Sequence, residues 1–288
     1  MANLKEVKNR IASVNSTQQI TKAMKMVAAA KLRKAQDAIM QLRPYASKLE
    51  EILTNVSSAT DDLEIKYAEV SSEIKNVLII SVTSDRGLCG GFNSSIFKQT
   101  KATIAKKFPN ANVELLCIGK KANDHFTKNH FNVISDYAEI LKGLSFDKVR
   151  EVAEFAMDAF VEGKYDVVEV VYNEFKNVAT QVVVSEQFLP IVTAPKEEVS
   201  VSTDYIFEPN KEFIVKDLIP KSLKIKVYKA VLESNASENG ARMTAMDAAT
   251  ENAGELLKEL KLTYNRTRQA AITKEILEIV GGAEALAN

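Results

Sequence analysis

The chain of 288 residues has two cysteines, two histidines, no tryptophan and no long apolar run. Two thiols, Cys89 and Cys117, are too few for a disulfide framework, which favours a reducing compartment. Together with two histidines they do not supply the usual ligand set of a zinc site. No stretch approaches the roughly 20 apolar residues that cross a bilayer, and no secretory signal opens the chain. These absences predict a soluble, cytoplasmic protein without a metal or cofactor.

The formal net charge is zero, but the charge is unevenly distributed. Residues 1–50 carry ten Lys and Arg against three Asp and Glu, and residues 221–288 carry ten against nine. The middle of the chain is therefore acidic. A neutral total argues against a dedicated nucleic-acid-binding protein, which needs a clustered basic surface. The basic N-terminal arm predicts an acidic partner, whether protein, phosphate or membrane surface.

Apolar residues in segment 1–58 recur at alternating steps of three and four. They are Leu4, Val7, Ile11, Val14, Ala28, Leu32, Ala35, Ile39, Leu42, Ala46, Leu49, Leu53 and Val56. Gln18, Thr21 and Lys25 continue the same phase as a polar gap. A seam held in one register over this length is typical of a coiled coil. Pro44 lies inside the run and should bend the helix or remove one hydrogen bond.

Segment 221–288 has no proline and is rich in Ala, Leu, Glu and Lys, which are good helix formers. Asn239-Gly240 is a turn signal, but the alanine-rich periodicity resumes at once, so we expect the helix to continue. Ile272, Ile276 and Ile279 restore an apolar stripe near its end. Two long amphipathic helices can bury their stripes against each other, which predicts an antiparallel coiled coil.

Between these helices, residues 75–190 alternate strand and helix patterns. The expected strands cover 76–82, 113–118, 132–135, 166–172 and 180–188, and the expected helices cover 94–107, 120–129 and 145–162. Such alternation is typical of a parallel-type sheet with helices on its faces. The proline-containing segment 191–220 is interpreted as a connector. The predicted fold class is α/β plus long helices, an antiparallel coiled coil with an inserted Rossmann-like α/β domain.

The richest local motif runs from Ser81 to Asn93 and follows the first expected strand. A helix start of this kind can hold a phosphate with main-chain N–H groups. The motif lacks both the G-x-G-x-x-G spacing and the Gly-Lys-Ser/Thr of a P-loop, so a tight turn that packs helix against sheet is favoured. Cys89 could be a nucleophile, but no base stands near it in sequence. A nucleotide-dependent enzyme is therefore the weaker alternative.

A second candidate surface is the basic stretch from Lys22 to Lys34. Its simplest interpretation is a solvated helix face. However, Ile20, Met24 and Val27 leave the seam and lie on another face, which suggests that something besides the partner helix packs there. A helix lying on a membrane surface is a further possibility.

Four motifs, in order along the whole chain, resemble the gamma subunit family of F-type ATP synthases. They are Ile20–Lys31 (ITKAMKMVAAAK), Ser84–Asn93 (SDRGLCGGFN), Glu238–Ala253 and Ile272–Ala283 (ITKEILEIVGGA). The resemblance implies a non-catalytic rotor shaft at the cytoplasmic face of the bacterial inner membrane. Such a shaft couples proton-driven rotation of a membrane ring to conformational cycling of the catalytic subunits. A coiled-coil chaperone or scaffold would leave these motifs unexplained.

The resemblance also implies partners and contact residues. The partners are the alpha and beta subunits of the catalytic head, the epsilon subunit and the membrane c-ring. The contacts with catch loops of the catalytic subunits fall on Lys22, Met24, Lys25, Arg268, Gln269, Thr273 and Glu275. Asp204, Tyr205 and Glu208 would face the ring and the epsilon subunit. The cysteine-bearing insertion of plastid members is missing from 193–204, so thiol switching of that type is not expected.

Overall fold

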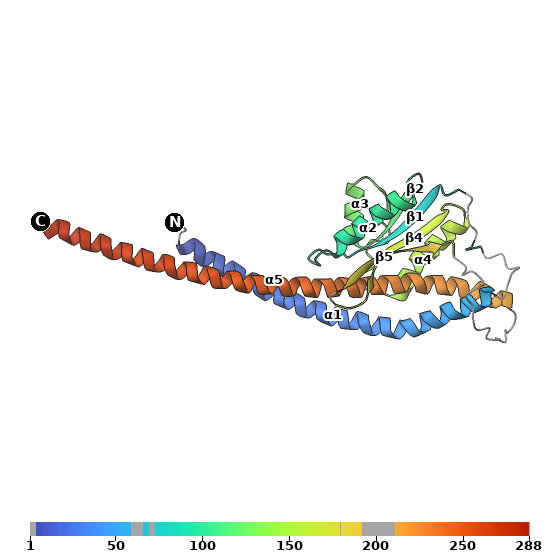
Figure 1. Cartoon of the computed structure of the whole chain (residues 1–288), viewed down its shortest axis with the longest axis horizontal. Helices are drawn as coiled ribbons and strands as arrows, with labels where there is room; N and C mark the ends of the chain where they lie inside the picture. Colours follow the sequence, from blue (N-terminus) through green and yellow to red (C-terminus); the bar gives the residue numbers. More distant parts are fainter. Residues whose placement is uncertain (1–3, 59–65, 69–72, 179, 192–210, 288) are drawn as a thin grey trace. The chain divides into compact units, whose positions relative to one another are not determined.

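A computed structural model describes residues 4–58, 66–68, 73–178, 180–191 and 211–287. Two long helices, α1 (Leu4–Ser58) and α5 (Lys211–Ala287), precede and follow the central elements along the chain (Figure 1). By their contacts the residues form two compact units. One contains Met1–Ala28 with Met243–Asn288, and the other contains Ala29–Arg242. Each long helix contributes residues to both units.

Within the first unit, α1 and α5 pair as an antiparallel coiled coil. Gln18 contacts Thr250, whereas Lys25, further along α1, contacts the earlier Asp247. The seam positions of α1 in this unit are buried or half-buried, and Val7 is the most enclosed of the apolar ones before residue 28. The predicted coiled coil is therefore confirmed.

The C-terminal helix is longer than predicted. We expected a connector over 191–220 and a helix from 221, but α5 begins at Lys211 and contains Pro220. The remainder of the expected connector, residues 192–210, lies outside the described residues.

Burial explains why α5 continues through Pro220. A proline inside a helix removes one hydrogen bond and costs about 3 kcal/mol. Ile219 and Leu223, on either side, are both buried in the core of the second unit. Each buried side chain of this size stabilises by about 1.5–3 kcal/mol. Two such residues offset the cost of the proline, so the sequence signal for a helix start at 221 was misleading.

Two other helix-breaking signals in the sequence do not end their helices. Helix α1 continues through Pro44, and α5 continues through Asn239-Gly240. The Asn239 side chain donates a hydrogen bond of 2.8 Å to the main-chain oxygen of Asn235, one turn earlier in the same helix. The amide is thereby satisfied within the helix instead of promoting a turn.

The second unit is built on a five-stranded sheet in the order β3-β2-β1-β4-β5. The strands are β1 (Asn76–Val82), β2 (Asn112–Ile118), β3 (Asn132–Ile134), β4 (Val167–Phe175) and β5 (Gln181–Leu189). The first four run parallel to their neighbours, but β5 runs antiparallel to β4. The expectation of a parallel-type sheet is wrong for β5. Only residues 176–180 connect it to β4, and a parallel pair needs a much longer crossover.

Helices cover both faces of this sheet (Figure 1). On one face, α4 (Phe146–Val161) and α5 enclose Leu78 and Ile80 of β1. On the other face, α2 (Phe92–Lys107) and α3 (Lys120–Lys128) enclose Val77 and Ile79 of the same strand. Successive residues of a strand point to opposite faces, which is why β1 is apolar throughout. Across the residues that the structure describes, no helix is long and apolar enough to cross a membrane.

Candidate functional site

The predicted contact residues of α1 differ in exposure within the first unit. Lys22 is exposed, and Met24 and Lys25 are half-buried. The Lys25 ammonium lies 2.5 Å from the Asp247 carboxylate of α5. An ion pair this exposed contributes little to stability, but it offsets the charge of Lys25. Lys22 is thus the more available cation of the two.

Large apolar side chains stand exposed beside these lysines. Ile20 is 56% exposed and Val27 is 58% exposed, and the two are seven residues apart on one side of α1. This arrangement agrees with the second apolar face expected from the sequence. Exposed apolar patches of this kind mark surfaces that bury against a partner.

The remaining contact residues predicted on α5 lie near its C-terminal end. Arg268, Gln269, Thr273 and Glu275 are all exposed, as is every residue of 268–283. In the first unit this end of α5 runs on beyond the first residues of α1, so among the described residues it has no helical partner there (Figure 1). Five large apolar side chains in this stretch are between 48% and 69% exposed, namely Ile272, Ile276, Leu277, Ile279 and Val280. Asp204, Tyr205 and Glu208 lie outside the described residues.

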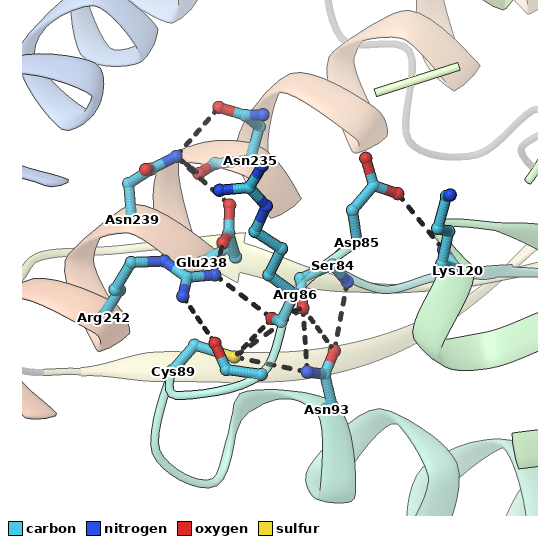
Figure 2. A network of polar contacts seen from close by, with 11 residues as sticks. Ser84, Asp85, Arg86, Cys89, Asn93, Lys120, Asn235, Glu238, Asn239 and Arg242 are labelled. Atoms are coloured by element: carbon cyan, nitrogen blue, oxygen red, sulfur yellow. Dashed lines mark hydrogen bonds and ion pairs between the residues drawn. The ribbon is translucent and has the colours of Figure 1, made fainter. Parts of the chain in front are cut away.

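The glycine-containing loop before α2 is closed by hydrogen bonds between its two ends. The main-chain N–H of Ser84 donates to Asn93 Oδ1 at 3.0 Å, and Asn93 Nδ2 donates to Ser84 Oγ at 2.8 Å. Leu88 and Gly90 both adopt positive φ, 64° and 58°, which gives the loop its tight path. Figure 2 shows the Ser84 and Asn93 side chains directed toward each other.

Arg242 of α5 binds this loop in the second unit. Its guanidinium donates to the main-chain oxygens of Gly87 at 2.5 Å and Arg86 at 3.2 Å, and it is paired with Glu238 (Figure 2). The loop presents carbonyl oxygens to a cation here, which is the opposite of an anion-binding arrangement. This geometry supports the packing interpretation of the motif. The sequence contained Arg242 within a recognised motif, but nothing in the pattern indicated which loop it binds.

Neither cysteine is placed for catalysis. Cys89 is buried beside Asn93, whose Nδ2 lies 3.2 Å from its sulfur, and burial raises the pKa of its thiol. Cys117 is fully buried, which raises the pKa of its thiol to about 12. A protonated, enclosed thiol is a poor nucleophile. Over the described ranges, no group of three or more His, Cys, Asp or Glu residues is arranged to hold a metal ion.

Comparisons with known proteins agree on one family. The family model described as ATP synthase matches residues 3–286. The ATP synthase gamma chain of Cytophaga hutchinsonii is 61% identical over 297 residues, which cover 100% of both chains. The gamma chain of Flavobacterium psychrophilum is 56% identical over 287 residues, which cover 99% of each chain.

Solved structures show the same fold. A chain of the Tetrahymena thermophila mitochondrial ATP synthase central stalk and c-ring structure is 26% identical with a TM-score of 0.58, covering 80% of this chain and 99% of that one. A chain of the Euglena gracilis mitochondrial ATP synthase is 22% identical with a TM-score of 0.63, covering 98% and 94%. The family match and the near full-length relatives lead to one assignment: this chain belongs to the ATP synthase gamma chain family.

Proposed function

We propose that this chain is the central rotor shaft of a proton-translocating ATP synthase and has no catalytic site of its own. It would be a peripheral protein at the cytoplasmic face of the bacterial inner membrane. Rotation of the c-ring would turn the shaft, and the shaft would drive the alpha and beta subunits through successive conformations. The observation that carries this proposal is the unpaired C-terminal end of α5.

The apolar side chains of this end lie on one broad face of the helix. At 100° per residue, Ile272, Ile276 and Ile279 fall close together, whereas Lys274 and Glu278 fall on the opposite side and pair at 3.5 Å. Within the first unit α1 does not extend far enough to cover the apolar face. An exposed face of this width is stabilised only when a partner encloses it. A ring of catalytic subunits around the helix would supply that enclosure.

Exposed polar residues lie on α5 just before the apolar face and also on α1. Arg268 and Gln269 are exposed one turn before Ile272, and Lys22 is exposed on α1. Apolar contacts are non-directional and let one surface turn against another. Charged hydrogen bonds are directional and hold particular angular positions. Acidic catch loops that bind these cations in turn would couple the orientation of the shaft to the state of each catalytic subunit.

The opposite end of the shaft would be formed by the α/β domain and the segment that contains Asp204, Tyr205 and Glu208. We propose that this segment contacts the c-ring and the epsilon subunit. The support is the family membership and the central stalk and c-ring structure of the relative from Tetrahymena thermophila.

Native co-purification from the source membrane tests the proposal. The chain carries a tag, and the mass of the intact assembly is measured under mild conditions. The proposal predicts one copy of this chain together with several copies each of two ATPase subunits. A free monomer or dimer, with the partner subunits expressed in the same cells, would contradict it.

A further inference from the structure

Three elements of the second unit meet at one guanidinium group. Arg43 of α1 directs Nη2 toward the main-chain oxygen of Phe175, the last residue of β4, at 3.3 Å. The same nitrogen lies 3.4 Å from Glu233 Oε1 of α5. One side chain of α1 thereby contacts both the sheet and the other long helix.

The Glu233 carboxyl group is buried, which costs free energy. Only 2% of its side chain is exposed, and its Oε2 has no hydrogen-bond partner among the described residues. Burial raises the pKa of its carboxyl group, although the nearby charges of Lys229 and Arg43 act against this. A buried carboxylate that is only half satisfied destabilises a protein relative to an apolar side chain of similar size. The global stability of the fold therefore does not explain a glutamate here.

The contact lies next to a proline of α1. Arg43 immediately precedes Pro44, which has no N–H to donate to the main-chain oxygen of Met40. Helices bend at such positions. The seam residues nearby, Leu42 and Ala46, are half-buried and apolar, and apolar contacts fix the register of two helices less specifically than a polar contact does. A directional polar contact at this point makes the register more specific.

We propose that Arg43 and Glu233 form a register lock that fixes the axial position of α1 against α5 and the end of β4 at the Pro44 joint. The two residues are positioning residues. The inference rests on the proposed shaft function, in which a slip between the two helices would dissipate torque before it reached the catalytic subunits. The lock keeps the helix pair in one register under load.

The test uses the assembled ATP synthase in inverted membrane vesicles. Two quantities are measured for each variant: the protons pumped per ATP hydrolysed, and the melting temperature of the purified chain. Glu233→Gln keeps the shape of the side chain but replaces the charged acceptor with a neutral amide oxygen, which holds the Arg43 guanidinium less strongly. Its melting temperature is expected to stay level or rise, while the pumping ratio falls about two-fold or more. If Glu233 served stability alone, the substitution would not lower the pumping ratio while the melting temperature stayed level or rose.

Arg43 provides the second half of the test. Arg43→Met keeps the aliphatic stem and should lower the pumping ratio as Glu233→Gln does, whereas Arg43→Lys should restore part of it. The pumping ratio of the double variant should be no lower than that of either single variant, because each single change already weakens the same contact. Lys48→Met is the matched control: it removes a cation from an exposed ion pair with Glu51 on the same helix and should leave the ratio unchanged.

Unchanged pumping ratios in Glu233→Gln and Arg43→Met, or losses that simply add in the double variant, would overturn the lock. If Arg43→Met does not fold, Glu233→Gln decides the question alone. Failure of the unmodified chain to assemble or to couple would instead contradict the proposed function. The test therefore distinguishes a wrong register lock from a wrong shaft function.

Discussion

The hydroxyl oxygens of Thr21 on α1 and Thr250 on α5 lie 2.8 Å apart in the polar gap of the coiled-coil seam. Gln18 Nε2 donates to the main-chain oxygen of the same Thr250 at 3.3 Å, and Lys25 pairs with Asp247. Each polar residue of the gap on α1 therefore meets a polar partner on α5. A matched polar layer in an apolar seam specifies register and helix orientation.

The first prediction concerns this threonine pair. Thr21→Val should lower the free energy of unfolding by about 0.5–1.5 kcal/mol, because the hydroxyl of Thr250 loses its partner across the seam. Adding Thr250→Val should recover most of the loss, since both partners are then apolar and of the same shape. Chemical denaturation of the purified chain measures both values. Thr17→Val, at an exposed position on the same helix, is the control, and additive losses in the double variant would refute the pairing.

The second prediction concerns Gly119, between β2 and α3. Its φ is +98°, and a Cβ there would lie 2.5 Å from the main-chain oxygen of Thr83. Gly119→Ala should destabilise the chain by about 3 kcal/mol through clash and backbone strain. Gly163 also has positive φ, but a Cβ there meets nothing within 4 Å. Gly163→Ala should therefore cost only about 1 kcal/mol, and equal losses for the two variants would argue against the close approach.

The third prediction is a pH dependence at the contact between α2 and α3. The His125 ring stacks on Phe97 with centroids 4.0 Å apart, and burial, assisted by Lys101, lowers the pKa of His125 below 6.5. The folded state therefore binds fewer protons than the unfolded state. The stability contributed by neutral His125 is complete above about pH 6.5 and is lost as the pH falls through the folded pKa.

Thermal unfolding between pH 8 and pH 5 measures this effect. His125→Gln should flatten the decline in melting temperature below pH 6.5, compared with the unmodified chain. An equally steep decline in the variant would show that other groups cause the acid sensitivity.

The fourth prediction tests the proposed contacts at the end of α5. Arg268→Ala combined with Gln269→Ala should reduce coupled ATP synthesis in the assembled enzyme and leave the fold intact, because both side chains are exposed. Lys274→Ala removes a cation from the opposite side of the same helix and should have little effect. Circular dichroism checks the fold, and an unchanged synthesis rate in the double variant would remove these residues from the contact surface.

Much of the architecture follows from local pattern. The seam of α1 and the strands of the sheet were predictable because burial on one or both faces dictates which positions are apolar. The antiparallel direction of β5 was missed, although the short connection between the expected strands 166–172 and 180–188 already excludes a parallel crossover. The start of α5 was missed because tertiary burial of Ile219 and Leu223 overrides the local penalty of Pro220.

The polar contacts between distant elements were the least predictable. Arg242 and the loop at Gly87 are 155 positions apart, and Arg43 and Glu233 are 190 apart. Spacing rules describe neighbours within one helix or one strand, so they carry no information about such pairs. The exposed apolar face near Ile276 was visible in sequence as a stripe, but its lack of a partner helix became apparent only in the structure.

Direct observation of rotation tests the shaft function most directly. Cys89 and Cys117 are buried, so a single cysteine introduced at the exposed Lys128 of α3 can be labelled selectively with a probe. The catalytic head is fixed to a surface and supplied with ATP, and the probe is followed in single assemblies. The shaft function predicts continuous rotation of the probe in one direction during hydrolysis. ATP hydrolysis with a stationary probe on this chain would contradict it.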